Sequence, residues 1–70
     1  MKYKYRLIAW DTDVGTCDTK LNDDYGPLYD HAQQQAGEES INWQPWHNDA
    51  TGVYQMGTVN NHVFMIEELR

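Results

Sequence analysis

Hydrophobic and polar side chains alternate from residue 2 to residue 10, with the period of a β-strand. One side of this segment carries only apolar and aromatic side chains: Tyr3, Tyr5, Leu7 and Ala9. The other side begins with Lys2, Lys4 and Arg6 and becomes apolar at Ile8 and Trp10. We therefore expect a strand that is exposed on one side at its start and buried on both sides toward its end.

Residues 11–24 interrupt this pattern with Asp, Thr, Gly and Asn and with few apolar side chains. That composition predicts a surface loop. Loops of more than about 12 residues are unusual in small domains and are often functional. This segment is therefore the first place to look for a site.

A helix is predicted between Pro27 and Gly37. Proline suits the first helical turn, and glycine commonly follows the last one. Leu28 and Ala32 fall on one face, whereas Asp30 falls on the opposite one. So short an amphipathic helix needs a sheet to pack against.

The remaining sequence predicts three strands. Residues 41–47 are aromatic and alternating, but Pro45 cannot donate a ladder hydrogen bond, so this strand should lie at an edge or carry a bulge that turns both Trp43 and Trp46 inward. Residues 48–52 have turn composition.

Two β-rich runs, residues 53–59 and 62–68, flank Asn60-Asn61, which tolerates the positive φ of a tight hairpin turn. The predicted fold class is α+β. We expect a single domain over residues 1–70, of order β-α-β-β-β, with one helix packed on a three- to four-stranded antiparallel sheet.

The charge is strongly one-sided. The chain has 70 residues and a net charge of −6, and residues 7–69 carry eleven acidic side chains against the single cation Lys20. Such a field repels nucleic acid and anionic lipid and attracts basic protein surfaces. The lone cysteine, Cys17, precludes an intrachain disulfide, and the chain has neither a membrane-length apolar run nor the apolar region of a signal peptide. A cytoplasmic location is expected.

Two metal sites are conceivable from composition. Asp11, Asp13 and Asp18 could hold a hard cation, but the EF-hand positions for Gly and Glu are occupied by Thr16 and Asn22. Cys17 with the three histidines, His31, His47 and His62, could hold zinc, but their spacing lacks the close ligand pairs of structural sites. We expect local Asx-turns, no metal and no cofactor.

Catalysis is likewise not expected. Cys17 with a histidine could form a nucleophile and base, and Asp11 with a histidine an acid–base pair, but the sequence has no phosphate loop and no strand-turn-helix nucleophile motif. So short a chain also leaves little room for a water-excluding pocket.

Aromatic residues offer binding anchors, because Trp and Tyr dominate interface hot spots. Trp10, Trp43, Trp46 and Tyr54 are the candidates, and we expect two of the three Trp in the core and at most one exposed beside the acidic rim. Tyr3 and Tyr5 beside the basic side chains suggest base stacking, but the acidic field opposes nucleic-acid binding.

These features favour a small acidic, non-catalytic binding protein that occupies a basic, nucleic-acid-binding surface of another protein. Phage-encoded inhibitors of host nucleases, including anti-CRISPR proteins and DNA mimics, are similar in size and charge alone. The expected partner-binding residues are acidic or aromatic: Asp11, Asp13, Asp18, Asp23, Asp24, Asp30, Glu38, Glu39, Trp46 and Tyr54.

Two alternatives remain open. The chain could be a homodimer or assembly protein that pairs through an edge strand, either residues 2–9 or the strand containing Pro45. It could also be a cation-binding domain that uses Asp11, Asp13 and Asp18.

Overall fold

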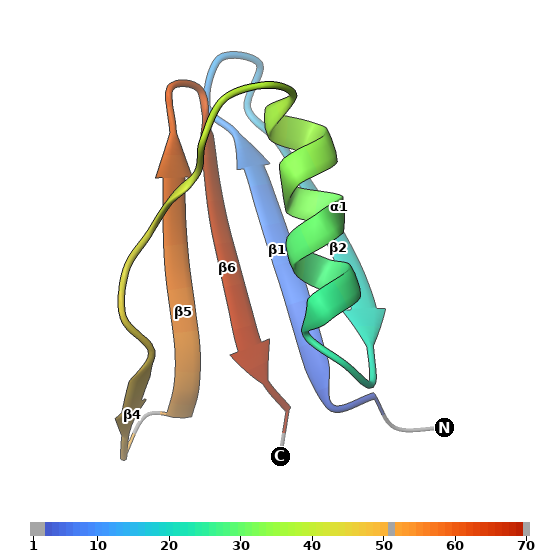
Figure 1. Ribbon diagram of the computed structural model, residues 1–70, viewed down its shortest axis with the longest axis vertical. Helices are drawn as coiled ribbons and strands as arrows, with labels where there is room; N and C mark the ends of the chain where they lie inside the picture. The colour runs from blue at the N-terminus through green and yellow to red at the C-terminus, as the bar shows by residue number, and fades with distance from the viewer. Residues whose placement is uncertain (1–2, 51, 70) are drawn as a thin grey trace.

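The computed structural model describes residues 3–50 and 52–69 and has two layers, a helix and a sheet (Figure 1). The elements are, in chain order, β1 (Tyr5–Asp11), β2 (Thr16–Asn22), α1 (Gly26–Ala36), β3 (Asn42–Trp43), β4 (His47–Asp49), β5 (Gly52–Val59) and β6 (His62–Glu68). All strand pairs are antiparallel, so the predicted α+β class, with one helix packed on an antiparallel sheet, is confirmed.

The strands lie side by side in the order β2-β1-β6-β5-β3, and β4 also pairs with β5. β1 lies between β2 and β6, with Leu7 opposite both Lys20 of β2 and Ile66 of β6. Because side chains alternate along a strand, this register divides every strand between a side that faces α1, the helix side, and the opposite side, the open side.

The helix lies in front of β1 and β2 in Figure 1 and begins and ends close to the predicted residues. Pro27 is in its first turn, and Gly37 follows its last residue at a φ of 72°, where its N–H donates to the Gln33 carbonyl at 2.9 Å. Leu28 and Ala32 are buried against the sheet. Among the described residues no helix is long and apolar enough to cross a membrane.

The hydrophobic core lies entirely between the helix and the sheet. Its fully buried members are Leu7, Ala9, Leu28, Ala32, Phe64 and Ile66. The four strand residues among them all point to the helix side. Among the residues that the structure describes, the other side of the sheet contributes no buried side chain to this core.

The prediction of a loop over residues 11–24 is wrong, because Thr16–Asn22 forms strand β2 along one edge of the sheet. Asp11 pairs with Thr16 across a short turn, and Gly15 supplies the positive φ of 74° that this turn requires. The strand escaped detection because nearly all its side chains are exposed, so apolar and polar residues alternate only weakly along it. With β2 and with the strand predicted over residues 41–47 divided in two, the sheet has six strands instead of three or four.

The C-terminal hairpin is confirmed, with Val59 paired to His62 across Asn60-Asn61. Among the described residues, however, only glycines have positive φ, so the asparagines form this turn without the left-handed conformation. The strand predicted over residues 41–47 lies at the other edge of the sheet, as Pro45 led us to expect, but it is divided into β3 and β4, which both pair with β5. The expected turn at 48–52 is shorter, since β4 extends to Asp49.

Candidate functional site

Five aromatic rings form a continuous cluster on the helix side of the sheet, and we call it the aromatic cluster: Tyr5, Tyr25, Tyr29, Trp43 and Trp46. Tyr25 is its centre, with ring centroids 5.5 Å from Tyr5, 5.8 Å from Tyr29 and 6.1 Å from Trp46. Trp43 joins through Tyr29, at 4.9 Å. All four contacts are edge-to-face, the arrangement that the ring quadrupoles favour.

The aromatic cluster is held in place by Gln55, a buried polar residue of β5. Its side-chain amide donates to the Gln44 carbonyl at 2.7 Å, and its carbonyl oxygen accepts the hydroxyl of Tyr29. The side chain thus connects the sheet to the helix and to the segment between β3 and β4. This connection fixes Trp43, at the end of β3, and Trp46, in the segment after it, relative to α1.

Gly57 makes room for Trp43. A Cβ at position 57 would lie 2.5 Å from Cε3 of the indole and 2.8 Å from Cγ2 of Ile41, far inside normal contact. The indole can therefore pack directly on residue 57 of β5 only because that residue has no side chain.

Burial raises the pKa of the Tyr29 hydroxyl above its usual value near 10. A hydrogen bond with Trp46 opposes this shift, and the neighbouring Tyr25 hydroxyl adds to it. Tyr29 is therefore an uncharged hydrogen-bond donor at neutral pH, which suits its bond to Gln55.

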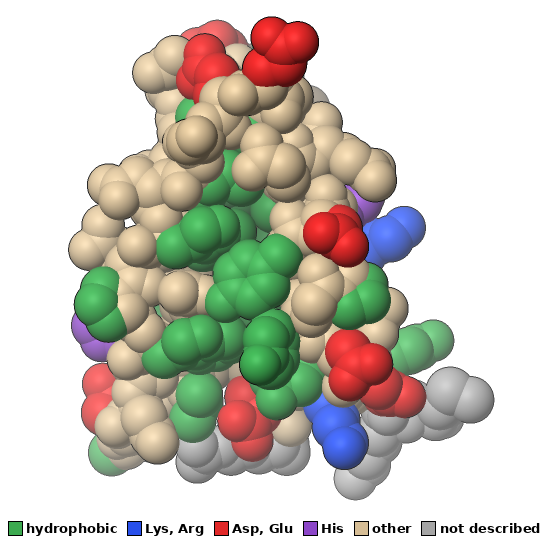
Figure 2. All heavy atoms as spheres, in the orientation of Figure 1, with side chains coloured by type: hydrophobic (Ala, Val, Ile, Leu, Met, Phe, Trp, Pro, Cys, Tyr) green, Lys and Arg blue, Asp and Glu red, His purple; other side chains and the backbone are tan. Residues whose placement is uncertain are grey.

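The aromatic cluster is exposed at the end where α1 begins. Tyr25 is 49% exposed and Trp46 is 38% exposed. Figure 2 shows the hydrophobic side chains on this side of the molecule, with acidic side chains around them. Asp23 and Asp24 directly precede Tyr25 in the chain and are exposed. An apolar, aromatic anchor thus lies next to two carboxylates.

The other acidic residues expected to bind a partner do not gather around this anchor. Glu38 and Glu39 follow the opposite end of α1, about 15 Å away along an 11-residue helix. Asp30 lies between the two ends and is exposed, and Asp13 lies in the β1–β2 turn. The carboxylates are therefore spread along the helix side and its ends.

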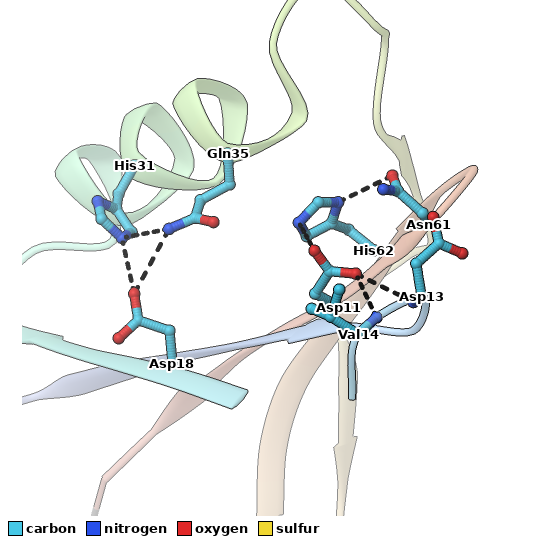
Figure 3. Close-up of polar contacts among 8 residues, drawn as sticks. All are labelled: Asp11, Asp13, Val14, Asp18, His31, Gln35, Asn61 and His62. Carbon is cyan, nitrogen blue, oxygen red and sulfur yellow. Dashed lines mark hydrogen bonds and ion pairs between the residues drawn. The ribbon is translucent and has the colours of Figure 1, made fainter. Parts of the chain in front are cut away.

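Asp11 is engaged within the fold (Figure 3). Its Oδ1 accepts the backbone N–H groups of Asp13 and Val14 at 3.0 and 3.3 Å, and its Oδ2 lies 3.7 Å from Nε2 of His62. The Asx-turn predicted from sequence is thus present. Asp11 stabilises the hairpin turn and is a weak candidate for partner contact.

Asp18 faces the helix from the edge strand (Figure 3). Its Oδ2 lies 3.7 Å from Nε2 of His31 and accepts a bond of 3.4 Å from Gln35. The carboxylate remains 63% exposed, so these contacts leave it accessible.

Tyr54 is on the open side, away from Trp46. It stacks on His47 with a centroid distance of 4.8 Å and an interplanar angle of 14°. The structure therefore does not unite the two aromatic residues that the sequence selected as anchors. Trp46 belongs to the aromatic cluster and Tyr54 to the opposite surface.

The described residues hold no group of three or more His, Cys, Asp or Glu side chains placed to bind a metal. Of the residues of the cation alternative, Asp11 ends β1, Asp13 lies in the turn after it and Asp18 lies in β2. Cys17 is exposed on the open side opposite Trp10, whereas His31 and His62 lie on the helix side, so the fold brings neither imidazole to the thiol.

Tyr25 and Tyr29 are the binding-site candidates that sequence reasoning missed. Their i, i+4 spacing places them on one side of α1. That spacing, together with the acidic pair just before Tyr25, was a usable signal. Tyr5 could not be linked to them without knowing that β1 runs beneath the start of the helix.

Comparison of the chain with protein-family models, with curated proteins and with solved structures gave no match in any of the three.

Proposed function

We propose that this chain is a small, non-catalytic binding protein that uses the exposed end of its aromatic cluster, together with Asp23 and Asp24, to engage a basic surface on another protein. The observation that carries this proposal is the exposure of Tyr25 and Trp46 beside the exposed residues Asp23 and Asp24 in a chain of charge −6. Exposed Trp and Tyr supply anchoring energy, and carboxylates steer encounter with Lys and Arg.

The proposed mode of action is competition for a nucleic-acid-binding surface. Asp23 and Asp24 would occupy positions that phosphates take on a basic groove, while the carboxylates farther along the helix side would add to the attractive field. Inhibition of a nucleic-acid-binding enzyme, of the kind used by phage-encoded anti-CRISPR proteins and DNA mimics, remains the specific form of the proposal. A cytoplasmic setting is part of it, since such targets act there.

Matched charge reversals test the proposal. A target is first isolated from a host lysate at low salt and purified, and its binding to the chain is then measured by surface plasmon resonance. Asp23→Lys/Asp24→Lys is compared with Glu38→Lys/Glu39→Lys, because both double variants change the net charge by the same amount. A general field effect would slow both equally.

We expect the reversal at positions 23 and 24 to reduce the association rate about tenfold or more and the control to reduce it less. Tyr25→Ala should mainly accelerate dissociation, since it removes a contact made in the complex. Equal rates for both double variants, or binding that is insensitive to salt, would refute this surface as the docking site.

A further inference from the structure

The open side of the sheet carries a continuous apolar surface that the fold leaves uncovered. The register places Ile8, Met65 and Met56 in one row across β1, β6 and β5, and Trp10 and Val63 in the adjacent row. We call these five residues the open-face strip. Each is partly exposed, because α1 lies on the opposite side.

The open side also differs from the rest of the molecule in charge. Of the eleven carboxylates, the ladders place two there: Glu67, which is paired with Arg6, and Asp49, at the corner formed by β4. The remaining nine lie on the helix side or in the turns that flank it. The open side is thus close to neutral in a strongly anionic protein.

We propose that a second copy of this chain packs on the open-face strip, forming a symmetric sheet-on-sheet dimer. Like-charged copies repel wherever carboxylates would meet, and the open side is the surface on which two copies approach with the least repulsion. A basic protein is drawn instead to the helix side, and an anionic membrane is repelled by the net charge. Packing two sheets face to face is a standard way to bury such a surface.

The open side of the sheet is large enough for a dimer interface. Four neighbouring strands of seven or eight residues, with the shorter β3 and β4 along one edge, span roughly 20 Å by 24 Å, a footprint of about 500 Å² before the relief of the side chains is added. An interface of about 1,000 Å² in total, near the minimum for a specific complex, takes about 500 Å² from each partner, so this footprint meets that minimum. A small domain with a one-sided core also gains most from a second layer.

Analytical ultracentrifugation of the full chain tests the proposal. We expect a concentration-dependent dimer of twice the 8.2 kDa monomer mass. Met65→Lys, in the middle of the strip, should be monomeric at all concentrations. Thr58→Lys is the safer variant, because residue 58 is exposed on the same face and its substitution leaves the core intact. It should weaken dimerisation about tenfold or more, whereas Gln34→Lys on the exposed surface of α1 should leave it unchanged.

The methyl resonances of Met56 and Met65 locate the interface. In a dilution series with methyl-labelled methionine, both should shift over the concentration range in which the mass changes. A dimer formed by edge pairing at β2 would leave both methyl signals in place and would overturn the proposal. A protein that stays monomeric throughout the series, or a dimer that Thr58→Lys and Met65→Lys do not weaken, would overturn it equally.

Discussion

Phe64 and Met65 are neighbours on β6, but they belong to different environments. Phe64 is fully buried between the sheet and α1, whereas Met65 lies in the open-face strip with no layer above it. The same division holds for charge, since the helix side and its turns carry most of the carboxylates. The comparison shows that the core of this 70-residue chain lies on one side of the sheet. The other side carries an apolar strip, is close to neutral and is free to take a second layer.

The largest expected effect is the difference in lost stability between truncating Phe64 and truncating Met65. Phe64→Ala should destabilise the protein by about 3–5 kcal/mol, because it opens a cavity in a small core. Met65→Ala should cost about 1 kcal/mol or less when measured at a concentration below that of any dimer. Urea denaturation of both variants measures the difference, and similar losses would contradict a one-sided core.

Gly57→Ala should cost about 1–3 kcal/mol, since the added methyl group collides with the Trp43 indole and with Ile41 and forces them to shift. Thr58→Ala, one residue along the same strand but exposed on the open side, should change stability by less than about 0.5 kcal/mol. Thermal denaturation compares the two. If Gly57→Ala were neutral, the position assigned to Trp43 would be wrong.

Asp11→Ala should cost about 1 kcal/mol, because two backbone N–H groups of the hairpin turn lose their acceptor. Asp13→Ala removes a carboxylate from the same turn and should be nearly neutral. Chemical denaturation at moderate salt distinguishes the two effects. Equal losses would indicate that the charge of the turn, and not the Asx-turn, is what matters.

The smallest effect concerns pH. Burial raises the pKa of Tyr29 in the folded state, so the folded state favours the neutral hydroxyl. The contribution of this neutral hydroxyl to folding stability is complete below about pH 10 and is lost as the pH rises through the folded-state pKa. The melting temperature of the wild type should therefore fall on alkaline titration, and that of Tyr29→Phe should fall less steeply. Identical slopes would rule out Tyr29 as a source of the alkaline loss.

The sequence predicts those elements whose side chains are partly buried. The helix between Pro27 and Gly37, the C-terminal hairpin and the edge position of the strand that contains Pro45 all follow from spacing and from proline and glycine chemistry. β2 was missed because an edge strand with exposed side chains has the composition of a loop. Its weak signal was the alternation of Cys17, Thr19 and Leu21 on one side with Asp18 and Lys20 on the other.

The candidate site was less predictable for a geometric reason. The sequence identified Trp46, Asp23 and Asp24, but uniting them with Tyr25 and Tyr29 requires the packing of α1 beside the segment that follows β3. The separation of Tyr54 from Trp46 likewise depends on which side of β5 each faces. Such relations come from tertiary structure and not from composition.

The different roles of the two sides of the sheet are tested most directly by light scattering at low and at high salt, on the protein alone and mixed with a purified basic target. The dimer is apolar and the target complex is electrostatic, so screening should act on them in opposite directions. We predict that high salt preserves or strengthens the dimer and releases the target. A dimer that dissociates at high salt, or a target that remains bound, would contradict the division of roles between the two sides of the sheet.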